Sequence, residues 1–554
     1  MFRALSAFRL TLPVEIRVQA RAVGRSLAAS VGFAAVMAGS LVAQNKTKVS
    51  VDVAKPLTLL YSTSIGMGFE VSDGKALDPA TTQLLRDAGV TLLRYPGSGA
   101  AGLYHWSAGT LSNPYTKDKA PYWPPQNGFP ATASTLDGLG TALVAVNYGS
   151  NLDGSGGGEP TEAAAWVAYA NGSPSSAQAI GKDSKGNDWK TVGYWASLRA
   201  AIVLANDDGL NALRIGHPRP LGIQLWTIGS EVWNNGFYGK AHVAEPDLHA
   251  GPVESAKDLG SHGSDARLGP TTYGAAVVQF AKAMKAVDSS IFIGASMVAP
   301  PTGDDNLGKN WNANVLKAAC ASMDFAAVSF VEGGATLSPD YKRMNENELL
   351  LSALATDYQA LTHDLLDKYK KFCPAGKTPP LAVTNMGVQT WPKVDKPVAI
   401  GLFAADAMAT LIEAGAYTVV WSPAHSVHFL DSDNNAPKPA YYGLRLLHLI
   451  APKAGDSFVT ATSQLPTLAV HAVKRADGGL GLLFINKDLQ QSVTVKVSIA
   501  GFNVGTKGTR YDYGQESVKN NAGVAESPID NLGSSFTIQI PLYSMSAVVI
   551  PKAQ

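Results

Sequence analysis

The chain has 554 residues, of which 46% are hydrophobic and only 16% are charged. Its formal net charge is +1 at pH 7, so the composition gives no basis for a nucleic-acid partner or for an acidic binding surface. The length exceeds that of one ordinary domain. We therefore expect two domains, one of them a barrel of about 250 to 350 residues.

The first 45 residues have the pattern of a targeting segment. Arg21 and Arg25 precede an apolar, alanine-rich run over 27–42, which ends in small residues near Ala43. This order is typical of a secretory signal. The run is short for a membrane span, and a membrane-anchoring helix is the alternative. We expect a leader at 1–45 and a secreted or periplasmic protein that does not associate with the membrane after the leader is removed.

Strand and helix signals alternate from residue 57 to residue 452. Apolar runs predict eight strands, the first within 57–69 and the others at 90–97, 141–149, 223–228, 290–297, 323–331, 380–387 and 416–423. Helices are predicted between and after them, including 78–88, 192–206, 273–287, 345–372, 397–415 and 440–450. Eight strands that alternate with helices favour a closed parallel barrel over a doubly wound sheet.

The composition changes after residue 456. Short alternating runs such as LAVHAVKR, GLGLLFINK and SVTVKVSIA follow one another with turns and without helices, which is typical of an antiparallel β-sandwich. The strand signal at 46–56 lies outside the barrel, and we expect it to join this second domain. The predicted fold class is α/β, with a (β/α)8 TIM barrel at 57–452 followed by a β-sandwich at 456–554.

One carboxylate follows the fourth predicted strand directly. The apolar run in LGIQLWTIGSEVWNNG breaks at Gly229 and Ser230, and Glu231 comes next. Barrel enzymes carry their catalytic residues at the carboxyl ends of the strands, so Glu231 is a candidate general acid/base. The alternative is that Glu231 only caps the helix that follows.

Several motifs recur along the chain in a recognisable order: LRYPG followed by YHW, NYGS, WTIGSE, MDFAAVSF, PLAVTN, GLFAADAMATLIEAGAYTVVW and LLFINK. In this order, over about residues 57–550, the chain resembles the α-L-arabinofuranosidases and β-xylosidases of clan A glycoside hydrolases. The resemblance implies action on arabinose- or xylose-containing polysaccharide. Retaining hydrolysis needs two carboxylates about 5 Å apart. The resemblance implies Glu231 as the acid/base and a glutamate after Thr384 as the nucleophile.

The sequence departs from the family pattern at three strand ends. Ser230 stands where the family has an asparagine, and Ser329 stands in the segment where it has a histidine. Asn385 occupies the nucleophile position. An amide has no anionic oxygen and is a poor nucleophile, although it can bond a sugar hydroxyl.

Three interpretations of Asn385 remain open at this point. The chain can be a carbohydrate-binding relative that no longer hydrolyses, or hydrolyses very slowly. Another carboxylate can take part instead, with Glu332 and Asp431 as candidates, and a wider separation would permit inversion through a water. The third interpretation is that the end of the seventh strand is placed wrongly.

Further candidates for substrate binding end neighbouring strands or flank Glu231. They are Arg94, Asn147, Tyr148, Ser230, Trp233, Ser329 and Trp421. The histidines are not spaced as metal ligands, and no cofactor motif is present, so we expect neither a metal nor a cofactor. Two cysteines, Cys320 and Cys373, can pair in an exported protein, but the sequence leaves their pairing open.

Overall fold

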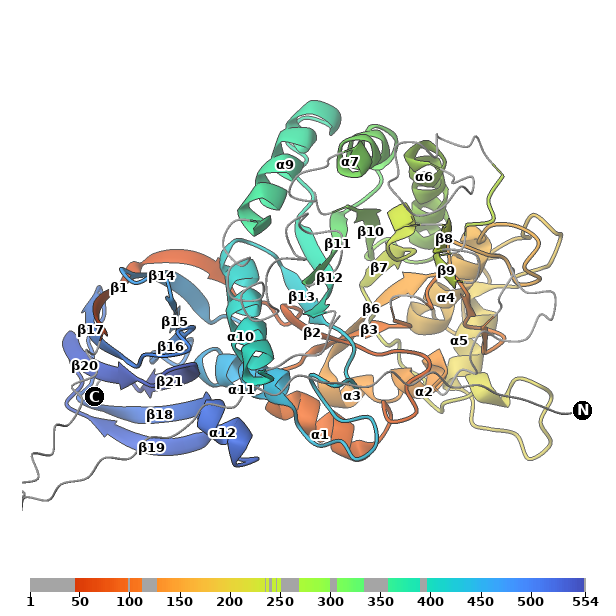
Figure 1. Ribbon diagram of the computed structural model, residues 1–554. Helices are drawn as coiled ribbons and strands as arrows, with labels where there is room; N and C mark the ends of the chain where they lie inside the picture. Colours follow the sequence, from red (N-terminus) through yellow and green to blue (C-terminus); the bar gives the residue numbers. More distant parts are fainter. Residues whose placement is uncertain are drawn as a thin grey trace, which may run out of the picture. The chain divides into compact units, whose positions relative to one another are not determined.

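The computed structural model describes residues 45–97, 100–111, 127–234, 236–238, 242–245, 247–250, 269–298, 306–332, 357–388 and 396–552 (Figure 1). The predicted leader lies outside these residues except for its last residue, Asn45, which is the first residue of a strand. None of the helices described is long and apolar enough to span a membrane.

Eight parallel strands close into a barrel (Figure 1). In their order around the barrel they are β2 (Ile65–Gly68), β3 (Leu92–Tyr95), β6 (Thr141–Val146), β7 (Leu225–Ile228), β10 (Phe292–Met297), β11 (Phe325–Glu332), β12 (Leu381–Val388) and β13 (Thr418–Trp421). Their side chains are mostly buried, as the near-continuous apolar runs predicted, because parallel strands are covered on both faces. The predicted barrel is confirmed.

Helices connect these strands. They are α1 (Pro79–Asp87), α4 (Pro160–Asn171), α5 (Val192–Ala200), α6 (Pro270–Val287), α7 (Asn306–Ala319), α9 (Asp357–Phe372) and α10 (Val398–Glu413). The side chain of Asp78 caps α1 by accepting the Ala80 amide at 3.0 Å. Helix α5 is shorter than predicted because the backbone is already extended at Ala201.

Shorter elements lie in the connecting segments. They are β4 (Tyr104–His105), β5 (Thr110–Leu111), α2 (Phe129–Ala133), α3 (Leu136–Leu139), the 3-10 helices η1 (Asn211–Leu213) and η2 (Val232–Asn234), β8 (Gly236–Tyr238) and β9 (His242–Glu245). Strands β4 and β5 form one antiparallel hairpin, and β8 and β9 form another. The sequence analysis predicted neither hairpin.

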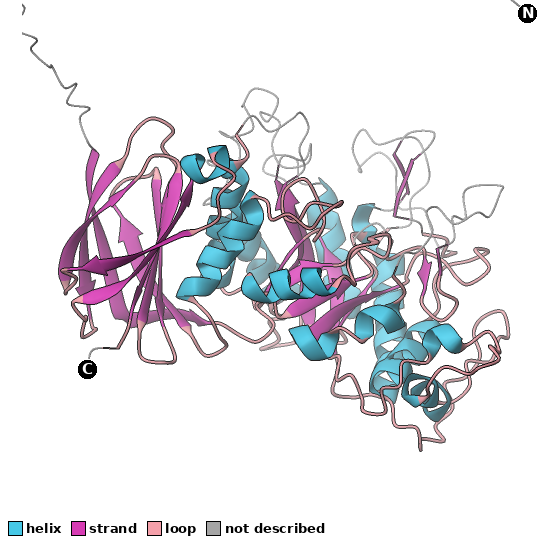
Figure 2. Ribbon diagram, turned by 90° about the horizontal axis from the view of Figure 1, so that it is seen from below, coloured by secondary structure: helices cyan, strands magenta, loops and turns pink. Residues whose placement is uncertain are grey.

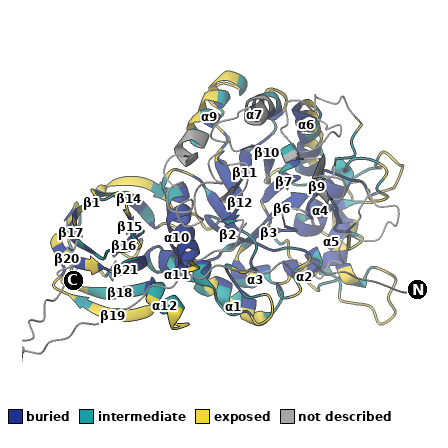
Figure 3. Cartoon of the chain, in the orientation of Figure 1, coloured by how far each residue is buried: buried dark blue, intermediate teal, exposed yellow. Residues whose placement is uncertain are grey.

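The second sheet has nine strands in the order β19-β18-β21-β16-β15-β14-β1-β17-β20. Figure 2 shows this sheet in magenta at the left of the view. Its elements are β1 (Asn45–Leu59), β14 (Ser457–Ser463), β15 (Leu468–Lys474), β16 (Leu480–Asn486), β17 (Val493–Ala500), β18 (Lys507–Gly514), α12 (Gln515–Lys519), β19 (Ala525–Asp530), β20 (Ser535–Ile540) and β21 (Ser544–Ile550). Residues from its middle and its outer strands share one apolar core. Figure 3 shows exposed residues on its outer strands.

Strand β1 differs from its prediction in two ways. It pairs antiparallel with β14 but parallel with β17, so the sheet is not wholly antiparallel. It also includes 57–59, which the sequence analysis assigned to the first barrel strand. Thr58 and Leu59 pair with Phe458 and Ser457 instead, and the barrel strand begins at Ile65. The apolar run at 57–69 is therefore divided between two sheets.

Helices α10 and α11 (Pro439–Ile450) contact the nine-stranded sheet. On β15, His471 contacts Asp406 and Glu413 of α10, with a nitrogen-to-oxygen distance of 2.9 Å to each, and Lys487 pairs with Asp406. Burial alone would lower the pKa of His471, but the charge of Glu413 and the hydrogen bond to Asp406 raise it to about 10. Burial alone would raise the pKa of Asp406, but Lys487 and His471 lower it to about 2.

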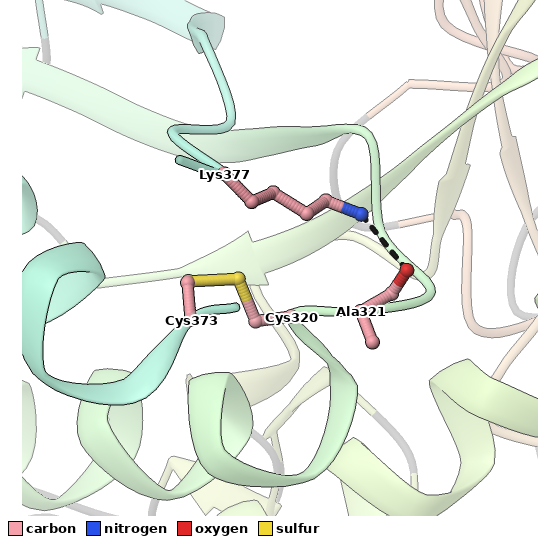
Figure 4. The surroundings of a disulfide bond; sticks show 4 residues. All are labelled: Cys320, Ala321, Cys373 and Lys377. Carbon is pink, nitrogen blue, oxygen red and sulfur yellow. Dashed lines mark hydrogen bonds between the residues drawn. A yellow bond between two sulfur atoms is a disulfide. The ribbon is translucent and has the colours of Figure 1, made fainter. Parts of the chain in front are cut away.

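A disulfide bond joins Cys320 to Cys373, with the two Cα atoms 5.4 Å apart (Figure 4). These residues directly follow α7 and α9, so the bond links the ends of two neighbouring barrel helices. Lys377 donates a hydrogen bond at 2.8 Å to the carbonyl of Ala321 beside the bond. The structure thereby settles a pairing that the sequence left open.

Candidate active site at the barrel mouth

Glu231 lies just beyond the carboxyl end of β7, in a tight turn. Its φ is +48°, and that of Gly229 is +66°; positive φ is uncommon for a residue other than glycine. A Cβ atom added to Gly229 would lie 2.5 Å from Val232 and 3.1 Å from Tyr148, so the turn leaves no room for a side chain there. Packing thus holds Glu231 in a backbone conformation that costs about 1–3 kcal/mol, which is often a mark of a functional position.

Asn385 contacts Glu231 across the mouth. It lies on β12, the seventh strand, and its Nδ2 donates a hydrogen bond at 2.9 Å to Oε1 of Glu231. Strands β10 and β11 separate β7 from β12 around the barrel. The group that faces Glu231 from the seventh strand is therefore an amide.

Arg94 and Ser230 form a buried pair beside Glu231. Arg94 ends β3 with 1% of its surface exposed, and its Nη2 donates a hydrogen bond at 2.5 Å to the hydroxyl of Ser230. Ser230 is itself buried. The arginine therefore orients the residue that precedes Glu231.

Glu70 is a carboxylate at the mouth that the sequence analysis missed. It follows β2 by two residues and is half-buried. It therefore lies just beyond the carboxyl end of the first barrel strand, beside the segment that follows β3. Its Oε2 lies 1.9 Å from the Cβ position of Gly97, close to the neighbouring backbone. The sequence feature that could have identified Glu70 is a carboxylate directly after the first predicted barrel strand.

The two carboxylates proposed from the sequence lie elsewhere on the rim. Glu332 is the last residue of β11, and its side chain is outside the described part of the chain. Asp431 lies in the loop after β13 and forms an ion pair with Lys438 at 2.8 Å. The hydrogen bond from Lys438 lowers the pKa of Asp431. The partner of this carboxylate is therefore a lysine of its own loop.

Asn147 bonds mainly within its own segment. Its Oδ1 accepts the Ser150 amide at 3.0 Å, and its Nδ2 donates at 3.3 Å to the carbonyl of Tyr104. These bonds fasten the loop after β6 to the β4–β5 hairpin. Beside them, Nδ1 of the buried His105 lies 3.1 Å from the carboxylate of Glu162 on α4, a pair that the sequence analysis did not predict.

Tyr148, the next residue of this loop, is also buried. Its ring stacks on that of His249, with the centroids 4.2 Å apart. Burial, together with the charge of Asp247, raises the pKa of its hydroxyl. Tyr148 therefore packs the wall of the mouth.

The remaining candidates differ in exposure. Trp421 is buried and contacts Phe403 with a centroid distance of 6.3 Å, so it belongs to the core. Trp233 and Ser329 are half-buried, and Ser329 lies directly opposite Asn385 in the register of β11 and β12. Of these two tryptophans, only Trp233 is partly exposed.

No family model matches the chain. The probable α-L-arabinofuranosidase C of Aspergillus clavatus is 25% identical over 184 residues, which are 31% of this chain and 28% of that protein. The enzyme of the same name from Aspergillus niger is 24% identical over the same shares. The chain therefore aligns with little more than a quarter of these relatives.

The similarity to solved structures covers more of the chain than the similarity to these relatives. An α-L-arabinofuranosidase from Thermotoga maritima, in complex with arabinose, has a TM-score of 0.62 at 18% identity, over 91% of this chain and all of that one. A family 51 α-L-arabinofuranosidase from Bifidobacterium longum has a TM-score of 0.63 at 16% identity, over 91% and 99%.

The chain resembles the α-L-arabinofuranosidases. The resemblance inferred from the motifs is thereby confirmed, in sequence over part of the chain and in fold over most of it. The fold is not limited to arabinofuranosidases, because the family 44 endoglucanase Cel44A from Clostridium thermocellum has a TM-score of 0.57 at 16% identity, over 91% of this chain and all of that one. The fold alone therefore does not identify the substrate or the reaction, which depend on the residues at the barrel mouth.

Proposed function

We propose that the barrel mouth of this arabinofuranosidase-like protein binds arabinose- or xylose-containing oligo- or polysaccharide, with Glu231 as its acid/base group. The strained turn at Glu231, its place at a strand end and the half-buried Trp233 nearby support this proposal. The proteins that the chain resembles are named α-L-arabinofuranosidases, and one of them was solved with arabinose.

The hydrogen bond between Asn385 and Glu231 is the observation on which the chemical part of the proposal depends. Retaining hydrolysis of a pentose glycoside, which carries no nucleophile of its own, requires a carboxylate opposite the acid/base. The amide of Asn385 occupies that place and cannot form a stable glycosyl ester. We therefore infer that pentose glycans are bound at the mouth but are cleaved very slowly or not at all.

Glu70 favours a second candidate function, which is hydrolysis with inversion. An inverting enzyme uses one carboxylic acid and one carboxylate about 6.5 to 9.5 Å apart, with a water between them. Glu70 lies two residues beyond the carboxyl end of the first barrel strand, with its carboxylate beside Gly97. Glu332 and Asp431 are the other candidates for the base in this mechanism.

The replacement Asn385→Glu tests the proposal, because it restores a carboxylate at the position that faces Glu231. We expect the wild-type protein to bind arabinoxylan oligosaccharides in calorimetry and to release little nitrophenol from 4-nitrophenyl α-L-arabinofuranoside. We expect Asn385→Glu to raise that rate by on the order of 100-fold or more, because it supplies the missing nucleophile.

Asn385→Gln is the matched control, because it has the length of glutamate without its charge, and its rate should stay at the wild-type level. Adding Glu231→Gln to Asn385→Glu should remove the gain. Wild-type turnover with inversion that is lost in Glu70→Gln would favour the second candidate. Failure of the wild-type protein to bind any pentose glycan would contradict the proposal.

We also propose that the mature protein is exported and that residues 1–45 are its leader. The disulfide between Cys320 and Cys373 supports export, because disulfides persist mainly in oxidising compartments. Sequencing the amino terminus of the protein recovered from the medium or periplasm would test this. We further propose that 57–452 and 456–554 act as barrel and sheet domains, with 46–56 completing the second.

A further inference from the structure

Hydrolysis with retention needs a nucleophile, but the group that faces Glu231 from the seventh strand is the amide of Asn385. Some sugars carry a nucleophile of their own. We propose that the same mouth hydrolyses glycosides of 2-acetamido-2-deoxy sugars, with the acetamido oxygen of the substrate replacing the missing carboxylate. This inference rests on the proposed acid/base role of Glu231, but it does not require that pentose glycans bind.

The position of Asn385 suits this chemistry. In a retaining reaction the nucleophile approaches the anomeric carbon from the face opposite the leaving group, while the acid/base is beside the leaving oxygen. Asn385 reaches the mouth from the strand that faces Glu231. A 2-acetamido group trans to the leaving group can bring its carbonyl oxygen to the anomeric carbon, so the substrates are β-glycosides of the gluco or galacto series. Arabinose and xylose lack this group.

The hydrogen bond to Glu231 assigns a direction to the amide of Asn385. Because Nδ2 is the donor to Oε1 of Glu231, the other arm of the amide is the acceptor Oδ1. An acceptor at this place can take the N–H of the acetamido group. That bond stabilises the positive charge that develops on the nitrogen as the carbonyl oxygen attacks. Asn385 therefore acts as a positioning group for a nucleophile that belongs to the substrate.

Ser329 lies beside Asn385. It is opposite Asn385 in the register of β11 and β12 and is half-buried. Its side chain is small, and its hydroxyl can both donate and accept a hydrogen bond. A small polar side chain next to Asn385 is compatible with the amide substituent of a 2-acetamido sugar.

The reaction balances in two steps. In the first, the acetamido oxygen bonds to the anomeric carbon, the bond from that carbon to the leaving oxygen breaks, and the carboxylic acid of Glu231 gives its proton to the leaving oxygen. The product is a cyclic oxazolinium ion. In the second, a water oxygen bonds to the anomeric carbon, Glu231 takes a water proton, and the ring C–O bond breaks to restore the acetamido group. The sum is hydrolysis with retention.

A substrate series tests the proposal with the full-length protein. We expect release of nitrophenol from the 4-nitrophenyl β-glycosides of N-acetylglucosamine or N-acetylgalactosamine, with little or none from the arabinofuranoside. The rate should fall steadily as the acetyl group carries one, two and three fluorine atoms, because fluorine weakens the carbonyl oxygen as a nucleophile. The thiazoline analogue of the oxazolinium ion should inhibit competitively.

Variants of Asn385 separate this role from a structural one. Asn385→Asp keeps an acceptor and should retain most of kcat, whereas Asn385→Ala should lose on the order of 100-fold in kcat with unchanged thermal unfolding. Glu231→Gln should lose turnover as well. Rescue by aspartate but not by alanine is a result that loss of packing alone would not give.

Three results would overturn the proposal. They are the absence of turnover of both hexosaminides by folded protein, a rate that does not respond to fluorination, and an inverted product whose formation depends on Glu70. Binding of arabinoxylan together with the first result would leave the proposed function intact and remove only this inference. Cleavage of hexosaminides without binding of pentose glycans would support this inference and contradict the proposed binding of pentose glycans.

Discussion

Charged side chains are arranged differently at the barrel mouth and where α10 meets the nine-stranded sheet. Between α10 and the sheet, Asp406 and Glu413 contact His471 and Lys487, so each carboxylate lies next to a group that carries positive charge. At the mouth, Glu231 accepts a hydrogen bond from the neutral Asn385, and Arg94 donates one to the neutral Ser230.

The difference indicates what each region does. A buried ion pair with well-placed partners contributes to stability mainly because removing one partner leaves the other charge uncompensated. Glu231, in contrast, is half-buried at the barrel mouth, where an incoming ligand can contact it. We therefore expect replacements near α10 to change folding, and replacements at the mouth to change binding and turnover.

The largest expected effect on folding is that of Asp406→Ala. It removes the carboxylate that contacts both His471 and Lys487 in a buried setting, and we expect a loss of about 3–5 kcal/mol in the free energy of unfolding. Urea denaturation followed by circular dichroism measures it. Asp530→Ala, at an exposed aspartate of β19, is the control and should stay within about 0.5 kcal/mol. Equal losses in both variants would contradict the assigned role.

The pH dependence of stability should be the next largest effect. The pKa of His471 rises from 6.5 to about 10 on folding, so its contribution is complete below pH 6.5 and is lost as the pH rises toward 10. The pKa of Asp406 falls from 3.8 to about 2, so its contribution is complete above pH 3.8 and is lost as the pH falls toward 2. Between pH 7 and 9 the stability should fall by about 1.4 kcal/mol per pH unit through His471.

Unfolding measured across this range tests the assignment to His471. In His471→Gln the slope between pH 7 and 9 should be shallower than in the wild-type protein by the share that the imidazole contributes. The same slope in both proteins would assign the titration to other groups.

The smallest expected effect on stability is that of Glu231→Gln. Glutamine has nearly the same shape, and its carbonyl oxygen can still accept the hydrogen bond from Asn385, so we expect a change within about 0.5 kcal/mol. Binding of arabinoxylan oligosaccharides should weaken by about tenfold, because an amide NH2 replaces one of the carboxyl oxygens that contact the sugar. Calorimetry measures both. A large loss of stability would contradict the expectation that replacements at the mouth change binding and turnover but not folding.

The sequence predicted the barrel because its strands are buried on both faces and read as apolar runs between helices. Glu231 was found because it directly follows such a run, and Asn385 because the resemblance places the nucleophile directly after Thr384. The start of the first barrel strand was predicted wrongly within the apolar run at 57–69, because apolar character does not specify which sheet a segment joins. The end of α5 was misplaced because Ile202 and its apolar neighbours lie exposed beyond it.

The pairs at the mouth were harder to predict. The bond between Arg94 and Ser230 joins residues 136 positions apart, and no local pattern encodes it. The parallel pairing of β1 with β17 is likewise a long-range contact. Glu70 carried the same local signal as Glu231, because it is a carboxylate that directly follows the apolar run at 57–69.

The bond between Cys320 and Cys373 has a consequence for the segment that it encloses. The chain between the two sulfur atoms includes β11 and with it Ser329 at the rim. A protease that cuts once inside this segment would yield two fragments that migrate together on a gel without reductant and separate after reduction. Such a nicked form would keep both of its halves covalently joined.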